Sequence, residues 1–166
     1  MVVKSKRSGK SVVPAQLDLG YVALFLGLRI NELVTARMAA LGFADVRESH
    51  GYVIQHLIEK ERTITELAER MDVTQQAASK VVAELARLGV IESVAAKDRR
   101  AKQIRLSRPG WRAVRLSRKL RTEFEARLIR AVGARGYDQA KRILLRCFDD
   151  LGGLERIRSR RIRPPR

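Results

Sequence analysis

The sequence predicts a mainly α-helical protein with one β-hairpin, built as a winged helix-turn-helix between long helices. Apolar residues recur at spacings of three and four through most of the chain, as in amphipathic helices. A short helix, a three-residue break and a second helix follow one another between residues 63 and 89, which is the order of a helix-turn-helix. Two short segments rich in branched residues, 90–94 and 102–107, come directly afterwards and indicate a hairpin.

Two helices are expected before the helix-turn-helix, from 17 to 41, ending near Gly42, and from 46 to 60. The helix-turn-helix itself carries clear end signals. Thr63 and Glu66 form a capping box at the start of its first helix, and Thr74 caps the second helix, which Gly89 closes. These signals place the break at residues 71–73.

Two helices are expected after the hairpin. Ser107 caps the first, whose opening turn tolerates Pro109, and this helix extends to about Val132. The segment AVGARGYD should form a break before a last helix from about 138 to 151. Cys147 lies among apolar residues of that helix, so we expect it to be buried and inert.

Charge is the strongest compositional signal. The chain has 35 Lys and Arg against 18 Asp and Glu, a net charge of +17 and a pI near 11.2. Such a balance indicates a polyanionic partner, with nucleic acid the first candidate and an anionic membrane surface the second. Basic residues also crowd both ends, so residues 1–16 and 152–166 are expected to be flexible basic arms.

Membrane insertion and secretion are not expected. No apolar run approaches the roughly 20 residues of a membrane span, and the basic start is not followed by the apolar core of a signal peptide. We therefore expect a soluble, cytoplasmic protein.

The stretch TQQAASKVV, residues 74–82, is unusual for a helix surface. Helical spacing turns Ala78, Val81 and Val82 toward a core and leaves a polar face without an acidic residue. Glutamine can pair bidentately with adenine in the major groove, and serine and lysine can reach a base edge or a phosphate. An ordinary solvated face is the alternative, but the helix-turn-helix spacing and the basic hairpin favour base contact. The residues of this face are Gln75, Gln76, Ser79 and Lys80.

The chain resembles the multiple-antibiotic-resistance regulator (MarR) family of bacterial transcription factors. The resemblance rests on TITELAERMDVTQQAASKVVAELARLGVIE followed by DRRAKQIRLSRPG, in which Asp98, Arg100, Leu106, Ser107 and Gly110 follow the family's wing pattern. It covers about residues 17–151, in the family's order of elements. The chain departs from many relatives at Ser93 and Val94, where they carry arginines, and at Ser79-Lys80, where they carry threonine and arginine.

The resemblance implies a DNA-binding surface. Arg100 would reach the minor groove, Asp98 would orient the wing arginines by an ion pair, and the other wing cations would contact phosphates. Together with the recognition helix, the expected DNA-binding residues are Thr74, Gln75, Gln76, Ser79, Lys80, Lys97, Asp98, Arg99, Arg100 and Lys102.

The resemblance also implies an obligate homodimer. Residues 17–45 and 108–151 would form the helical dimerisation region, and 46–107 the winged helix-turn-helix. A two-fold dimer would bind a pseudo-palindromic operator with half-sites roughly 10 base pairs apart. Many relatives release DNA on binding small, often aromatic, acids. The corresponding cleft would lie near Phe25, Arg29, Arg47 and His50, although dimer core and plain surface are alternatives for these residues.

These observations favour a sequence-specific double-stranded-DNA-binding regulator, expected to be a repressor located at the nucleoid. A nucleoid-type protein that coats DNA through charge alone is the alternative, whereas an RNA-binding module is disfavoured by the 5% aromatic content. We expect no enzyme activity, metal or cofactor. The two histidines, His50 and His56, do not share a helix face, and no catalytic motif is present.

Overall fold

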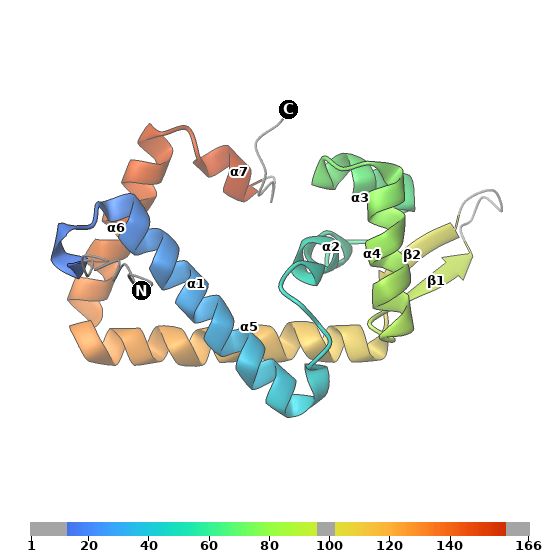
Figure 1. Ribbon diagram of the computed structural model, residues 1–166, viewed down its shortest axis with the longest axis horizontal. Coiled ribbons are helices and arrows are strands. Elements are labelled where there is room, and N and C mark those ends of the chain that lie inside the picture. The colour runs from blue at the N-terminus through green and yellow to red at the C-terminus, as the bar shows by residue number, and fades with distance from the viewer. Residues whose placement is uncertain (1–12, 96–101, 159–166) are drawn as a thin grey trace, which may run out of the picture.

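The computed structural model describes residues 13–95 and 102–158. Predictions about residues 1–12, the hairpin loop 96–101 and the basic end 159–166 lie outside the described residues. The winged helix lies at the start of one long helix, α5 (Arg108–Val132), which α1 (Leu19–Met38) crosses and α6 (Ala134–Asp150) follows (Figure 1). The elements, in order, are η1 (Pro14–Gln16), α1 (Leu19–Met38), η2 (Ala39–Phe43), α2 (His50–Leu57), α3 (Ile64–Met71), α4 (Gln75–Arg87), β1 (Ile91–Ala95), β2 (Lys102–Leu106), α5 (Arg108–Val132), α6 (Ala134–Asp150) and α7 (Leu154–Arg158).

The end signals of the helix-turn-helix are confirmed. Thr63 accepts a hydrogen bond from the backbone N–H of Glu66 at 3.2 Å, and the Glu66 carboxylate accepts one from the backbone N–H of Thr63 at 2.7 Å. The resulting hydrogen bonds hold the pKa of Glu66 below its ordinary value. Asp72 ends α3 in the left-handed region with φ +52°, which turns the chain sharply into α4.

The hairpin is antiparallel, and Ile91 pairs with Leu106 while Ser93 pairs with Ile104. An isolated bridge between Arg62 and Ile104 adds the chain segment before α3 to the open edge of β2. Arg62 is only 1% exposed, and its Nε donates to the carbonyl of His56 at 2.8 Å. The bridge therefore joins the base of the wing to the segment before α3, and the Arg62 side chain joins that segment to α2.

A junction around Val90, which we call the Val90 junction, joins α4, the wing and α5. Ser107 donates its backbone N–H to the carbonyl of Val90 at 3.1 Å and its hydroxyl to the carbonyl of Gly89 at 2.5 Å. The same hydroxyl accepts from the backbone N–H of Gly110 at 3.1 Å, capping α5 as the sequence predicts. Gly110 packs directly on Val90, so the three elements meet at one point.

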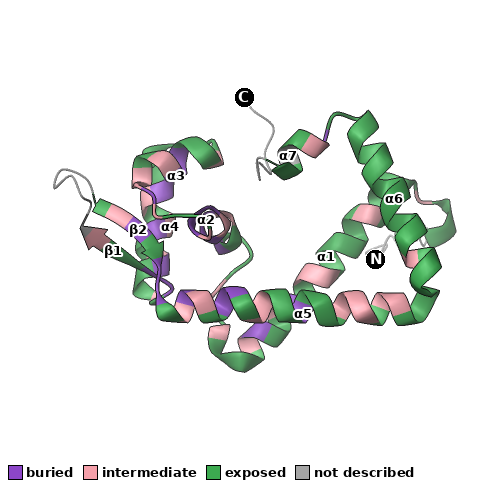
Figure 2. Cartoon of the chain, turned by 180° about the vertical axis from the view of Figure 1, so that it is seen from behind, coloured by how far each residue is buried: buried purple, intermediate pink, exposed green. Residues whose placement is uncertain are grey.

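The core has two parts. The larger part fills the winged helix, and the buried residues that α2, α3, α4, the hairpin and α5 contribute include Val53, Leu67, Leu85, Ile104 and Val114. A smaller part joins α1 to α5 through Val34, Met38, Ala113 and Leu120. Figure 2 shows buried residues concentrated in the winged helix and the adjoining half of α5, while α6 is exposed along its length.

Three local predictions were wrong. The second helix spans only His50–Leu57, because residues 47–51 enter it through turns, such as that closed by the backbone bond from His50 to Arg47. The last helix begins at Ala134, since Gly133 alone, with φ +77°, supplies the break. Cys147 is exposed, because the apolar side of α6 on which it lies is covered by no other described element.

The prediction that no segment is long and apolar enough for a membrane span was also wrong. Within the described residues, one helical segment, Leu19–Phe43, meets that requirement by length and composition, and only 6% of its most apolar window is buried. One such helix near the N-terminus is weak evidence for a membrane protein. An exposed apolar face of this kind is equally what an oligomer interface requires.

The Val90 junction predicts a strong effect of Gly110→Ala. The added Cβ would overlap the carbonyl oxygen of Val90, which belongs to the backbone and cannot rotate away. We expect the free energy of unfolding to fall by about 1–3 kcal/mol in urea denaturation. Gly51→Ala is the matched control: its Cβ meets no atom within 4 Å, so it should not destabilise. Equal stability of the two variants would contradict the role of the junction.

Candidate nucleic-acid interface

The inner face of α4 fixes this helix in the winged-helix core. Ala78, Val82 and Leu85 are buried there, and Leu67 of α3 belongs to the same cluster. Burial of such side chains stabilises each by roughly 1.5–3 kcal/mol, so the helix cannot roll without a large loss. The inward side of the predicted recognition helix is confirmed.

The outer face of α4 is polar. Gln75, Gln76 and Lys80 are exposed, and Ser79 is half-buried at the edge of the face. Ala83 continues the face as a small exposed residue, which lets a large partner approach the helix closely. The structure thus places these predicted DNA-binding side chains on the side facing away from the core.

The start of α4 suits an anionic partner. The hydroxyl of Thr74 accepts from the backbone N–H of Ala77 at 3.1 Å, and the first turn contains no acidic residue. The positive end of the helix dipole and the remaining N–H groups therefore point outward beside Gln75. A phosphate can be held at this end while the glutamines meet the bases.

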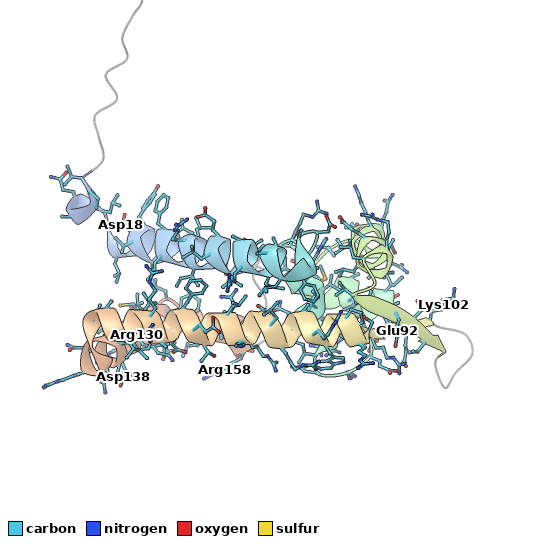
Figure 3. All side chains as sticks on the ribbon, turned by 90° about the horizontal axis from the view of Figure 1, so that it is seen from below. Asp18, Glu92, Lys102, Arg130, Asp138 and Arg158 are labelled. Carbon is cyan, nitrogen blue, oxygen red and sulfur yellow. The ribbon has the colours of Figure 1, made fainter. Side chains whose placement is uncertain are left out.

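The two described basic residues of the wing differ, because Arg105 forms ion pairs and Lys102 is exposed. Arg105 stands opposite Glu92 in the hairpin, with its Nε 2.8 Å from Glu92 Oε1 and its Nη1 3.5 Å from Glu61 Oε1. The hydrogen bond that Arg105 donates to Glu92 is the main reason that the pKa of Arg105 is raised. Lys102 is exposed near the tip, and Figure 3 shows Glu92 and Lys102 on the hairpin at the opposite end of the protein from Arg130 and Asp138.

The remaining predicted wing contacts cannot be placed. They lie outside the described residues and are Lys97, Asp98, Arg99 and Arg100.

Behind the interface, α4 is tied to the start of α2. Arg47 Nη2 donates to Glu84 Oε1, and His50 Nε2 lies 3.3 Å from Glu84 Oε2. The backbone N–H of Arg47 donates to His50 Nδ1 at 3.1 Å, so a neutral ring carries its proton on Nε2 and can donate to Glu84. The pKa of Glu84 is lowered, first by the hydrogen bond from His50 and then by that from Arg47.

A cavity of about 300 Å³ lies between α1, α2 and α5, next to this cluster. Its apolar lining includes Val34, Met38, Ile54, Ile58 and Val114. Its charged and amide lining consists of Asn31, Arg47, Glu48, Gln55, Arg118 and Arg121. Three arginines and one glutamate thus line the cavity together with apolar side chains, a lining that suits an amphipathic anion.

The four predicted effector residues are not brought together. Phe25 is exposed and stacks on Tyr21 at 6.2 Å, and Arg29 pairs with Glu32 at 2.7 Å. Neither of these residues lines the cavity, and His50 does not line it either, so Arg47 is the one member of the set in the lining. The sequence does not predict Arg118 and Arg121 as cavity residues, because the packing of α1 on α5 brings them to the same cavity as residues of α2.

Metal chemistry receives no support from the described part of the chain. There, no group of three His, Cys, Asp or Glu side chains is placed to hold a metal ion.

Comparison with known proteins follows this geometry. The family model described as the MarR family matches residues 44–101, which include α2, the helix-turn-helix and the first strand of the wing. Over this segment the chain is similar to the MarR family. No curated protein matches the sequence.

Solved structures extend the likeness beyond the matched segment. MepR of Staphylococcus aureus, a transcription regulator of the multidrug efflux pump MepA, is 17% identical with a TM-score of 0.66, over 81% of this chain and 99% of that one. YusO of Bacillus subtilis is 21% identical with a TM-score of 0.65, over 83% and 99%. A MepR mutant bound to an oligodeoxyribonucleotide is 18% identical with a TM-score of 0.61, over 82% and 99%. The chain therefore has the MarR-type fold from α1 onward, and the predicted fold class is confirmed.

The lowered pKa of Glu84 predicts a pH dependence that Glu84→Gln removes. A carboxyl group whose pKa is lower in the folded state adds stability above its ordinary pKa and loses it as the pH falls through the folded value. We expect the difference in unfolding free energy between wild type and Glu84→Gln to be largest above pH 4.5 and to shrink below it. Urea denaturation across the acid range measures this difference; a difference that does not vary with pH would contradict the assignment.

Proposed function

We propose that this protein is a sequence-specific regulator of transcription that binds double-stranded DNA through the outer face of α4. The observation that carries the proposal is the division of α4 into a buried side and a polar side free of acidic residues from Thr74 to Ala83. In the major groove, Gln75 and Gln76 can each pair bidentately with adenine, while Ser79 and Lys80 reach base edges or phosphates. The DNA-bound MepR structure supports this mode, because it has the same fold.

The wing is proposed to contact the flanking backbone. Lys102 is exposed for this role, and the basic loop residues Lys97, Arg99 and Arg100 would join it, with Asp98 orienting the arginines. Arg105 is not proposed as a DNA contact because its side chain pairs with Glu92 and Glu61. The net charge of +17 adds nonspecific attraction that weakens steeply as salt rises.

The protein is further proposed to act as a homodimer. Apolar side chains that a soluble monomer would hide are exposed on α1 and α6, among them Leu24, Phe25, Ile143, Leu144 and Phe148. Many exposed apolar side chains on two long helices are typical of an obligate interface. Pairing about a two-fold axis would present two recognition helices to half-sites about one helical turn apart on a pseudo-palindromic operator. The dimer would also cover the exposed apolar side chains of α1, so that no membrane is needed to shield them from water.

We assign the cavity between α1, α2 and α5 to an effector. Its lining fits a small molecule with an apolar body and an acidic group, whose binding would release the protein from its operator. We propose accordingly that the protein acts as a repressor in the cytoplasm, at the nucleoid. A DNA-coating protein that uses charge alone is the competing function, and the basic ends of the sequence are its main support.

Binding measurements on two DNA sequences separate these functions. A duplex selected in vitro from a random pool and a random duplex of equal length are titrated with wild type, Gln75→Ala and a variant lacking residues 1–12 and 159–166. We expect Gln75→Ala to weaken binding to the selected duplex by about 1–3 kcal/mol and to leave random binding unchanged. Gln16→Ala, which alters an exposed glutamine of η1, is the control. Equal binding of wild type to both duplexes, abolished by removing the tails, would contradict the regulator and support the coating protein.

The dimer predicts that a charge on α6 separates the subunits. Leu144→Glu puts a carboxylate in the exposed apolar face, whereas Arg142→Gln, on the opposite side of the helix, lowers the net charge by the same amount. Sedimentation equilibrium should show a dimer for wild type and Arg142→Gln and mainly monomer for Leu144→Glu. A monomeric wild type would refute the proposal.

A further inference from the structure

Arg47 takes part in both the cavity and a contact with α4. Its side chain lines the cavity between α1, α2 and α5, and its Nη2 donates to Glu84 of the recognition helix α4. Arg47 lies outside regular structure, before α2, and its side chain is 62% exposed. Its guanidinium can therefore be redirected without disturbing the core.

Glu84 is held on both carboxylate oxygens by the segment that precedes and begins α2. Arg47 takes Oε1, and His50, only 1% exposed and held through Nδ1 by the backbone N–H of Arg47, faces Oε2 at 3.3 Å. Glu84 follows Lys80 by one helical turn on α4. The two contacts therefore hold this side of α4 to the start of α2, one turn from Lys80.

The cavity offers an anion more positive charge than the lining itself neutralises. Arg121 Nη2 donates to Asn31 Oδ1 at 2.6 Å, and Asn31 Nδ2 donates to Glu48 Oε1 at 2.7 Å. A neutral amide thus separates Arg121 from the one carboxylate of the lining, and the partner of Arg47 is Glu84, which is not part of the lining.

We propose that an anion in the cavity and Glu84 compete for Arg47, which makes Arg47 the residue that couples cavity occupancy to the setting of α4. A carboxylate or phosphate head in the cavity binds the guanidinium in the same charge-assisted geometry that Glu84 uses. Glu84 then retains only His50, and α4 loses one of its two ties to α2. Sequence-selective binding falls, whereas attraction to any DNA, which depends on total charge, changes little. The inference rests on the proposed DNA-binding function and adds its means of regulation.

Gly51 allows the exchange to be tested without an identified ligand. It lines the cavity, lies four residues after Arg47, and a Cβ added there meets no atom within 4 Å. Gly51→Glu therefore provides a tethered carboxylate beside Arg47, and Gly51→Gln is a neutral control of the same shape. Both variants are titrated with the selected and the random duplex, in the wild-type background and in the Glu84→Gln background.

The exchange predicts that Gly51→Gln binds like wild type, while Gly51→Glu loses at least about tenfold in affinity for the selected duplex, within the usual range of coupling between sites. Its affinity for the random duplex should change far less. In the Glu84→Gln background the two Gly51 variants should bind the selected duplex alike, because Arg47 no longer has Glu84 to lose.

Two outcomes would overturn the exchange: equal selected-duplex binding by Gly51→Glu and Gly51→Gln, or a loss in Gly51→Glu that persists in the Glu84→Gln background, which would reflect added negative charge alone. Equal thermal unfolding temperatures of the two Gly51 variants show that folding is not the cause. If wild type itself does not prefer the selected duplex, the proposed function fails and the exchange with it. If wild type does prefer it while the Gly51 variants bind alike, only the exchange fails.

Discussion

The close approach of Gly110 to Val90 is the contact on which the arrangement of this protein depends. At that point the end of α4, both strands of the wing and the start of α5 meet, and Ser107 forms hydrogen bonds with the backbone of Gly89, Val90 and Gly110. A side chain at position 110 would force these elements apart. Because α5 continues from this junction toward α6, it also fixes the distance between the winged helix and the exposed helix α6 (Figure 1).

Given that junction, the chemistry of α4 follows from its two faces. Aliphatic residues fill the buried side. The outer side carries two glutamines and a serine, which both donate and accept hydrogen bonds, and a lysine, which only donates. Charge plays a different part. Arg105 forms ion pairs with Glu92 and Glu61, and Arg47 forms one with Glu84. Positive residues that look equivalent in the sequence therefore differ in what they can bind.

The sequence predicts well what depends on local period and end signals. Thr63, Thr74 and Ser107 cap the helices where expected, and the two sides of α4 are as the spacing predicts. It predicts poorly what tertiary contacts decide. Phe25 and Arg29 share a helix with the cavity residue Asn31 but do not reach the cavity, whereas Arg118 and Arg121 come from a helix 70 or more positions after Arg47. The exposure of Cys147 and of α1 likewise depends on what covers them, which no local pattern records.

The central claim is that Gln75 and Gln76 read adenine in the major groove, and atomic substitution in the DNA tests it most directly. Replacing single adenines of the selected duplex by 7-deazaadenine removes the N7 acceptor but preserves Watson–Crick pairing. Wild type should lose affinity at one or two adenines in each half-site, and Gln75→Ala or Gln76→Ala should be insensitive at the matching position. Uniform tolerance of 7-deazaadenine by wild type, or equal sensitivity in the glutamine variants, would contradict the account.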